Sequence, residues 1–464
     1  MMVWKKLLSG ERRSGQVGSR TALRSPFERD YHRIIGSAAF RRLQDKTQVF
    51  PLDKSDFIRT RLTHSLEVSS NGRSIGESVG EALLESGIDP TFTSDMKADM
   101  CQILQCAGLI HDIGNPPFGH FGEETIRDWF VKNLPGLTFE GRAVTELLSD
   151  WEKADLLHFE GNAQGLRLVA GLHFPDNGFG MDLTYGLLAA MIKYPTSSLK
   201  ADPAAADAKD RKMGYFKAER TVFEDIERKT GTEGKRSPLA LMLEAADDIA
   251  YATADIEDAF KKGYLDMETL TGELKSRGVS GDVPEMIKAA CENGVTEGVH
   301  DAQEYAVMSS IPEIQDLLVK AAADSFLTHY GEIMEGSYPY DLFAGTKAES
   351  LIRALKTIAY DRAFTTADIF RTEIAANTIL TYLLDHLVPA ALAYDTGHYP
   401  GLMEEKFLSL ISDNHKMFYR RFAEGKTEGE KVYLRLLLAA DSISGMTDSH
   451  ARDLYRELTG QLSQ

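Results

Sequence analysis

The chain has 464 residues and a formal net charge of −18 at pH 7, and 43% of its residues are hydrophobic and 26% charged. This composition is typical of a soluble globular protein, and the acidic balance argues against a protein that coats duplex nucleic acid. A phosphate-bearing substrate stays open, because a metal ion and a few cationic side chains can reverse the sign of the potential inside one pocket.

Two further features of the sequence point to the cytoplasm. No apolar run approaches the ~20 residues that cross a bilayer, and the charged N-terminus is too short for a signal peptide. The three cysteines, Cys101, Cys106 and Cys291, match no spacing typical of a metal site or a disulfide framework. We therefore expect a protein of the reducing cytoplasm, built as one large helical unit or two coupled ones.

Strand-like alternation is almost absent, so the predicted elements are helices. Gly, Ser and Pro make residues 1–30 an N-terminal arm, and apolar positions at helical spacing predict a helix over 28–48. Thr63 is typical of a helix N-cap, which places His64 in the first turn of the next helix. In isolation such a histidine is more often a partner of a backbone group or a carboxylate than a metal ligand. Arg59 and Arg61 just upstream fit either surface charge or anion binding.

The next helix ends in a pair of metal-type ligands. Its apolar positions lie three and four residues apart, so they share one face: Met100, Ile103, Leu104 and Ala107. That face ends in His111 and Asp112, and a Gly/Pro turn over residues 114–117 stops the helix. Imidazole and carboxylate suit Mn, Fe, Co, Ni or Mg-class ions, whereas structural zinc sites more often use thiolate.

The rest of the chain divides into a core and a C-terminal region. Residues 123–134, 162–172, 184–193 and 238–262 should be helical, and 196–236 is a compositionally biased, irregular insertion. We predict an N-terminal arm (1–30), a core (31–265) that contains this insertion, and a helical C-terminal region (266–464). The last part is expected to serve oligomerisation and to complete the pocket.

Carboxylates line one face of the predicted long helix that begins at Pro238. Asp247, Tyr251 and Asp255 are spaced i, i+4 and i+8. Carboxylates within an Ala-rich, closely packed helix are costly unless they are paired or metal-bound. The alternative is an amphipathic helix with a solvated acidic side.

These residues carry a resemblance. The order His64, His111-Asp112, Asp247 resembles the H…HD…D pattern of the HD-domain metal-dependent phosphohydrolases. Longer segments resemble the bacterial dGTP triphosphohydrolases, and the resemblance covers nearly the whole chain. The segments are 40–51, 59–68, 111–123, 159–164 and 244–251, with 438–448 similar to the C-terminal segment of that family.

The resemblance implies an all-α fold, with an HD-domain helical core and an additional C-terminal helical region. It implies an enzyme that hydrolyses a dNTP, with dGTP as the favoured substrate. The products are the deoxynucleoside and triphosphate, and water attacks at the α-phosphorus. Carried onto this sequence, the metal ligands are His64, His111, Asp112 and Asp247, with Asp248 as the competing choice for the fourth. Mg or Mn is the expected ion, and Fe, Co or Ni would also suit these ligands.

The same resemblance assigns further residues. His120 and Glu123 match the catalytic pair, in which the carboxylate orients the imidazole and raises its pKa. The imidazole would act as general acid to the 5′-oxygen or assist the attacking water, and the sequence does not choose. The substrate contacts carried over are Arg61, Lys193 and Lys212 for the triphosphate, Tyr251 and Asp255 for the deoxyribose and its 3′-hydroxyl, and Gln44 near the sugar or base.

The resemblance also implies a homo-oligomer, often a hexamer, with a nucleotide or single-stranded DNA as candidate effector. Two other functions are consistent with the same residues. One is an HD-type phosphodiesterase or phosphatase acting on a nucleoside monophosphate or cyclic nucleotide. The other is a non-catalytic regulator that binds nucleotide or single-stranded DNA. Release of inorganic tripolyphosphate would identify the dNTP triphosphohydrolase, because neither of these two other functions produces it.

Overall fold

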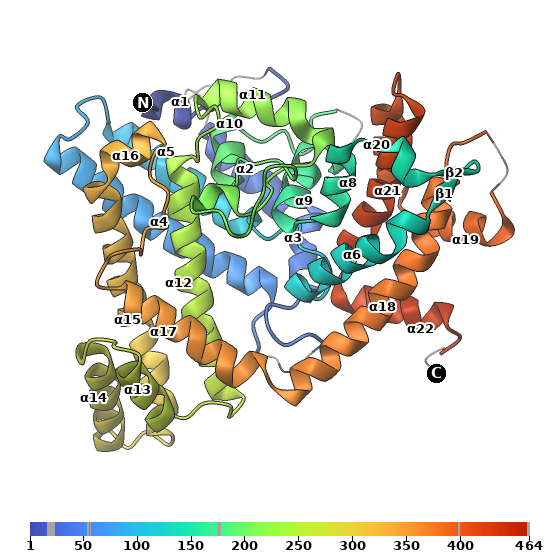
Figure 1. Cartoon of the computed structure of the whole chain (residues 1–464). Coiled ribbons are helices and arrows are strands. Elements are labelled where there is room, and N and C mark those ends of the chain that lie inside the picture. The colour runs from blue at the N-terminus through green and yellow to red at the C-terminus, as the bar shows by residue number, and fades with distance from the viewer. Residues whose placement is uncertain (16–23, 53–54, 56, 174–177, 398–399, 462–464) are drawn as a thin grey trace.

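The structure is a computed structural model that describes residues 1–15, 24–52, 55, 57–173, 178–397 and 400–461. Helices dominate it, and the predicted all-α class is confirmed (Figure 1). Within the described ranges the only paired strands are β1 (Thr138–Phe139) and β2 (Arg142–Ala143), a short antiparallel pair. No helix among these residues is both long and apolar enough to span a bilayer.

The N-terminal part forms short helices. These are α1 (Trp4–Leu7), α2 (Pro26–Ile35) and α3 (Ala38–Arg42), followed by the 3₁₀ turn η1 (Leu43–Asp45). The single helix predicted over 28–48 is therefore wrong. It breaks at Gly36, because the hydroxyl of Ser37 accepts a hydrogen bond from the backbone N–H of Phe40 and starts a new helix.

Helix α4 (Arg61–Ser86) begins earlier than the sequence indicated. Its N-cap is Thr60 and not Thr63, because each threonine hydroxyl accepts a hydrogen bond from the backbone N–H of the other in a capping box. Arg61 is thereby placed in the first turn, where its side chain is buried. His64 lies in the same turn, so the cation and the imidazole project from adjacent positions.

The turn after α5 (Ser94–Ile110) is tightly constrained. Gly114 packs on the backbone of α9, where a Cβ atom would collide with the backbone nitrogen of Gly165. Phe118 and Gly119 both have left-handed backbone conformations, with φ of 64° and 62°. Helix α6 (Gly119–Asn133) consequently starts four residues before the expected 123 and carries His120 and Glu123 in its first turn.

The remaining elements follow the predicted helical pattern, although residues 217–230 of the predicted irregular insertion form the turn η6 (Lys217–Glu219) and helix α11. The predicted helix over 238–262 is α12 (Pro238–Lys261). The other helices are α7 (Val144–Leu147), α8 (Asp150–Leu157), α9 (Gly161–Arg167), α10 (Tyr185–Met191), α11 (Arg220–Thr230), α13 (Met267–Ser276), α14 (Asp282–Thr296), α15 (Ala302–Thr328), α16 (Tyr330–Glu335), α17 (Glu349–Ala359), α18 (Ala367–Leu392), α19 (Leu402–Leu410), α20 (Asp413–Ala423), α21 (Glu428–Ser444) and α22 (Asp448–Leu458). The other short elements are the 3₁₀ turns η2 (Leu134–Gly136) and η5 (Ala208–Asp210) and the π-helical segments η3 (Leu168–Leu172) and η7 (Tyr360–Phe364).

The buried apolar side chains form two cores. The first core gathers side chains of α4, α5, α10, α12, α15 and α17, so it draws on both sides of residue 265. The second core packs α6 against α18, α21 and α22, and these elements lie together at the right of Figure 1. The turn over residues 114–117 passes from the first core to the second.

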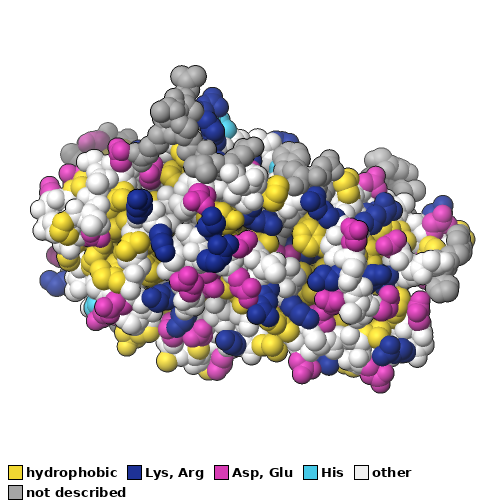
Figure 2. Space-filling view, turned by 90° about the horizontal axis from the view of Figure 1, so that it is seen from above, with side chains coloured by type: hydrophobic (Ala, Val, Ile, Leu, Met, Phe, Trp, Pro, Cys, Tyr) yellow, Lys and Arg dark blue, Asp and Glu magenta, His cyan; other side chains and the backbone are white. Residues whose placement is uncertain are grey.

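The surface carries both charge signs. In the face shown in Figure 2, acidic and basic side chains are interspersed among apolar ones. On that face, the described residues form no broad single-sign stripe of the kind that follows a nucleic-acid backbone.

Candidate active site

Three side chains from three helices meet at one point. His64 Nε2 of α4 lies 3.1 Å from Asp247 Oδ1 of α12. His111 Nε2, at the end of α5, lies 3.4 Å from the same oxygen. One ligand atom of each residue falls within 4.8 Å of the others. When ligand atoms bind one divalent ion, each about 2.0–2.2 Å from it, their distances from one another are similar to those found among these three side chains.

The hydrogen bonding of His111 leaves one ring nitrogen available. Its Nδ1 lies 2.8 Å from the carbonyl oxygen of Gly108, which fixes Nδ1 as the donor. Its Nε2 is buried and has no hydrogen-bond partner among the described residues. A buried lone pair aimed at a carboxylate oxygen is costly unless something cationic lies between them. The donor set of two imidazoles and a carboxylate fits a divalent metal ion.

Asp112 lies beside this cluster and faces a cation. One oxygen pairs with the Arg61 guanidinium and the other accepts a hydrogen bond of 2.8 Å from Asn115 Nδ2. Burial opposes its ionisation, but Arg61 and His111 hold the pKa of Asp112 below its ordinary range. Its Oδ1 is 3.5 Å from His111 Nε2. Its role as a fourth ligand stays a prediction.

Asp248 turns away from the histidines. It pairs with Lys356 of α17 at 2.6 Å, and burial raises its pKa to about 6. Asp247, in contrast, faces both imidazoles on one oxygen and pairs with Lys193 through the other. Burial disfavours the charge, yet Lys193 and His111 keep the pKa of Asp247 well below its ordinary value. The geometry therefore favours Asp247 over Asp248 in the cluster.

A second polar pair occupies the first turn of α6. His120 Nδ1 lies 3.4 Å from Glu123 Oε2, and the imidazole is 72% exposed. Glu123 is buried, and its other oxygen accepts a hydrogen bond of 2.8 Å from the Gly161 N–H. Burial raises the pKa of Glu123, but His120, Lys212 and Arg127 outweigh it and lower the pKa to about 2. The hydrogen bond and charge of Glu123 in turn raise the pKa of His120.

Three cations predicted for a triphosphate surround these groups. The guanidinium of Arg61 pairs with Asp112 and packs against Gly119, so it lies between the metal cluster and the His120–Glu123 pair. Its Nε has no hydrogen-bond partner among the described residues. Lys193 reaches Asp247, and Lys212 Nζ lies 3.2 Å from Glu160. The structure brings all three to the site from segments distant in sequence.

The two predicted deoxyribose contacts lie on α12, one and two turns beyond Asp247. Both carboxylate oxygens of Asp255 are buried and form no hydrogen bond of standard geometry with a described residue, although the Tyr251 hydroxyl lies close enough to act against the rise in its pKa. Burial and the nearby Asp258 raise its pKa well above the ordinary value. The ring of Tyr251 lies 6.1 Å from that of Phe364. Gln44 is exposed and lines, with Arg59, a cavity of about 240 Å³ that none of His64, His111 and Asp247 lines, so its contact with the sugar or base stays a prediction.

Two residues without a predicted role fix the turn. The buried Lys46 donates hydrogen bonds to the carbonyl oxygens of Asn115 and Ser444, at 2.5 and 2.7 Å. Asp448 accepts from the backbone N–H of Phe118 at 2.9 Å and from that of Thr47 at 3.0 Å. Both lie in segments that carry the family resemblance, but only the tertiary contacts indicate what they do.

Known proteins match the chain in the same regions. The model of the HD domain matches residues 61–212, which contain His64, His111 and the His120–Glu123 pair. A deoxyguanosinetriphosphate triphosphohydrolase-like protein of Listeria monocytogenes is 42% identical over 99% of this chain and all of its own length. One of Pseudomonas aeruginosa is 36% identical over both full lengths, and a deoxyguanosinetriphosphate triphosphohydrolase of Yersinia pestis is 32% identical over 93% of each chain.

Fold and site together define an HD-domain protein. The chain belongs to the deoxyguanosinetriphosphate triphosphohydrolase family.

Proposed function

We propose that the protein is a metal-dependent dNTP triphosphohydrolase that converts dGTP and water to deoxyguanosine and triphosphate. Family membership supports the reaction class. The observation that carries the proposal is the cluster of His64, His111 and Asp247, in which the buried Nε2 of His111 has no hydrogen-bond partner among the described residues. The Gly/Pro turn over residues 114–117 connects this cluster to the His120–Glu123 pair. Mg or Mn is the proposed ion, with Fe, Co or Ni as alternatives, because carboxylate oxygens suit Mg and Mn whereas imidazole nitrogens also suit the other three.

The ligands would be His64, His111 and Asp247, joined by Asp112. A divalent ion bound there polarises an α-phosphate oxygen and lowers the pKa of a bound water. The protein contributes the orientation. Gly108 fixes the tautomer of His111, and Asn115 and Arg61 hold Asp112. Such outer partners set the direction and basicity of the ligating atoms.

The cationic residues would bind the triphosphate. Arg61 is buried beneath the turn and offers an unused guanidinium N–H, which suits a phosphate oxygen. Lys193 and Lys212, which come from a later part of the chain than Arg61, add two further positive charges. Placed together, these cations offset the acidic balance of the whole protein within the pocket.

His120 is proposed as the general acid. Glu123 stays ionised near neutral pH and raises the pKa of His120, which favours the protonated imidazole that would donate a proton to the departing 5′-oxygen. The alternative, assistance of the attacking water, needs the neutral imidazole. The raised pKa of His120 therefore favours the acid role.

Asp255 and Tyr251 would select the deoxyribose. The buried oxygens of Asp255 can accept a hydrogen bond from a 3′-hydroxyl, and Tyr251, one turn earlier, would leave too little room for a 2′-hydroxyl. A polar group that is buried to match one ligand hydroxyl discriminates strongly against ligands that lack it. The homo-oligomer, the nucleotide or single-stranded DNA effector and the cytoplasmic location stay predictions.

The deciding experiment is a panel assay. The four dNTPs and four NTPs are incubated with the protein and Mn²⁺ or Mg²⁺, and tripolyphosphate is detected by anion chromatography. We expect tripolyphosphate from dGTP, its loss with EDTA and its return with Mn²⁺. Phosphate or pyrophosphate as the sole inorganic product would favour the phosphatase or phosphodiesterase. Nucleotide binding without turnover, unchanged in His120→Ala, would favour the non-catalytic regulator.

A further inference from the structure

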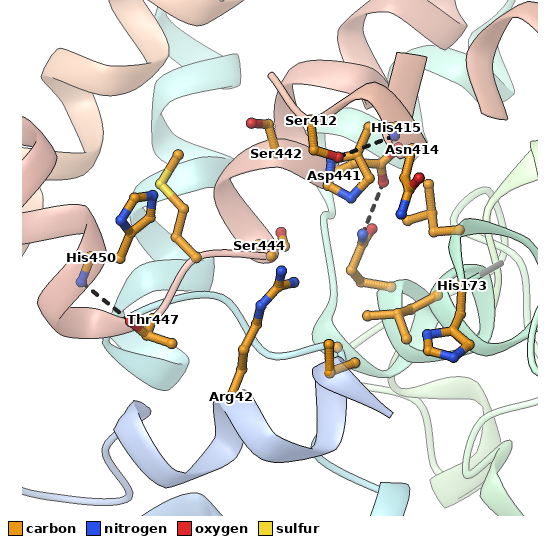
Figure 3. A pocket seen from close by; sticks show the side chains of 18 of the residues that line it. Arg42, His173, Ser412, Asn414, His415, Asp441, Ser442, Ser444, Thr447 and His450 are labelled. Carbon is orange, nitrogen blue, oxygen red and sulfur yellow. Dashed lines mark hydrogen bonds between the residues drawn. The ribbon is translucent and has the colours of Figure 1, made fainter. Parts of the chain in front are cut away.

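A second cavity lies outside the catalytic groups. It has a volume of about 540 Å³ and lies among α3, α9, α20, α21 and the start of α22 (Figure 3). None of the metal cluster or the His120–Glu123 pair lines it, and it meets the catalytic turn only at Gly114. Cavities of this size hold small organic molecules in other proteins.

The cavity has apolar walls and one free cation. Apolar side chains make up much of the lining: Ala38, Ala39, Leu168, Leu172, Leu410 and Met446. In Figure 3 the guanidinium of Arg42 extends from α3 toward Ser444 in the middle of the cavity. No hydrogen bond or ion pair joins Arg42 to another described residue. Its neighbour Arg41 is held differently, by a hydrogen bond of 2.7 Å to the carbonyl oxygen of Gly36.

Three side chains that line the cavity carry buried polar atoms without partners. Gln164 Oε1 and Ser444 Oγ are buried with no hydrogen-bond partner among the described residues, and so is His415 Nδ1. These side chains come from α9, α21 and α20. A buried polar atom costs free energy comparable to a lost hydrogen bond unless a ligand or water satisfies it. Three such atoms around one cavity indicate a site built for a polar ligand.

The negative charge that lines the cavity is paired. Among the described residues Asp441 is the only acidic one in the lining, and Gln164 Nε2 and the Arg167 guanidinium donate to that carboxylate at 2.8–2.9 Å. Burial, together with Arg42, lowers the pKa of His415 and lowers that of His173 to about 4. Two guanidinium groups line the cavity, those of Arg41 and Arg42, and that of Arg42 has no hydrogen-bond partner among the described residues.

We propose that this cavity is a second binding site for a small organic anion. Its single carboxylate or phosphate group would pair with Arg42, its apolar or aromatic body would lie against the leucines and alanines, and an N–H or O–H donor would meet Gln164 Oε1. The guanidinium of Arg42 suits one anionic group. Arg pairs with both carboxylate and phosphate through two parallel hydrogen bonds.

Calorimetric titration of the full chain tests the proposal. The probes are 4-hydroxybenzoate for a carboxylate, phenyl phosphate for a phosphate, and 4-hydroxybenzamide as the uncharged control. Binding is measured, so the result is independent of whether the protein hydrolyses dNTPs. We expect at least one organic anion to bind wild type and Arg42→Gln to weaken that binding about tenfold or more.

Matched variants complete the test. Ala38→Phe fills the cavity from α3 and should abolish binding, whereas Arg371→Gln, which removes a cation from the exposed face of α18, should leave it unchanged. Arg42 is exposed and makes no contact that folding depends on, so Arg42→Gln should fold normally. The proposal is overturned if no organic anion binds, if binding survives Arg42→Gln, or if a crystal structure shows a second copy of the chain filling the cavity.

Discussion

The carboxylate of Glu123 is surrounded by donors. His120, Arg127 and the Gly161 N–H all approach it, and it is buried. A carboxylate so placed stays ionised through the neutral range, and its charge stabilises the imidazolium of His120. The pair could be predicted from the sequence because its two members lie three residues apart on one helix. Arg127 also has helical spacing, four residues after Glu123, whereas the Gly161 N–H could not be predicted because it comes from a segment 38 residues further along the chain.

Replacing Glu123 with Gln should shift the pH profile of turnover. In wild type, kcat should fall as pH rises through the raised pKa of His120, because the acid form is lost. Without the carboxylate that pKa returns toward about 6.5, so the fall should begin at lower pH. We expect kcat to drop about 10²-fold, and more at pH 8 than at pH 6. The matched control is Glu124→Gln, an exposed neighbour. Parallel profiles for Glu123→Gln and wild type would show that Glu123 does not set the acid.

Replacing Asp255 should stabilise the protein and weaken its recognition of the substrate. Its pKa is raised by burial and by Asp258, so its ionised form destabilises the folded state at neutral pH. Asp255→Asn should therefore raise the free energy of unfolding by about 1 kcal/mol while lowering kcat/KM for dGTP about tenfold. Urea unfolding and steady-state kinetics measure the two effects.

The control for this variant lies two residues further along α12. Glu257 pairs with Arg59 and, at 2.7 Å, with Lys261, and these cations lower its pKa despite its burial, so Glu257→Gln should lower the free energy of unfolding. If Asp255→Asn also destabilised the protein, the carboxylate would have a structural partner and the sugar contact would lose its support.

At the scale of elements, the catalytic turn is held from outside. Lys46, from the segment before α4, donates a hydrogen bond to the backbone of this turn, and Asp448, at the start of α22, accepts one from it. Periodicity and caps predicted the helices on either side of the turn. They could not predict these contacts, which join residues about 70 and 330 positions apart. The same local signals misplaced the start of α4, since Thr60 and Thr63 are equally good caps.

Lys46→Met should loosen the turn. It leaves the carbonyl oxygens of Asn115 and Ser444 without a donor, which costs about 1–3 kcal/mol, and kcat should fall more than KM changes. Burial lowers the pKa of Lys46 to about 7, and the neutral amine keeps two N–H donors for these two carbonyls. Between about pH 7 and pH 10 the unfolded chain thus binds the extra proton, so wild-type stability should gain from rising pH there. The variant should lack that gain.

Denaturant unfolding at pH 7 and pH 9 measures the difference. Lys132→Met, at an exposed position on α6, serves as control and should change neither stability nor kcat appreciably. Equal pH dependence in Lys46→Met and wild type would mean that Lys46 stays protonated in the folded protein.

At the scale of the whole molecule, α9 connects the two cores. Leu166 packs in the first core and Ala163 in the second. At its end, the buried Arg167 bonds Asp441 of α21 with two nitrogens and Glu219 with a third, all at 2.7–2.8 Å. The helical class was predictable from composition and periodicity. The division into cores was not, because the helices of each core are far apart in sequence.

Arg167→Met should destabilise the protein by about 3–5 kcal/mol, because it leaves two buried carboxylates without their cation. Arg220→Met removes an exposed ion pair with Glu224 and should change stability by less than about 1 kcal/mol. Thermal unfolding of the two variants compares them directly. Similar midpoints would mean that water or other donors satisfy the buried carboxylates.

The placement of the site across both cores has a consequence for heat inactivation. His64, His111 and Asp247 project from helices of the first core, whereas His120 and Glu123 belong to α6 of the second. A relative slip of about 1 Å between them would separate the reacting groups and cost ~10²-fold in rate, although every helix stayed intact. Turnover should therefore decline on warming before far-ultraviolet circular dichroism changes, and cooling from that interval should restore it.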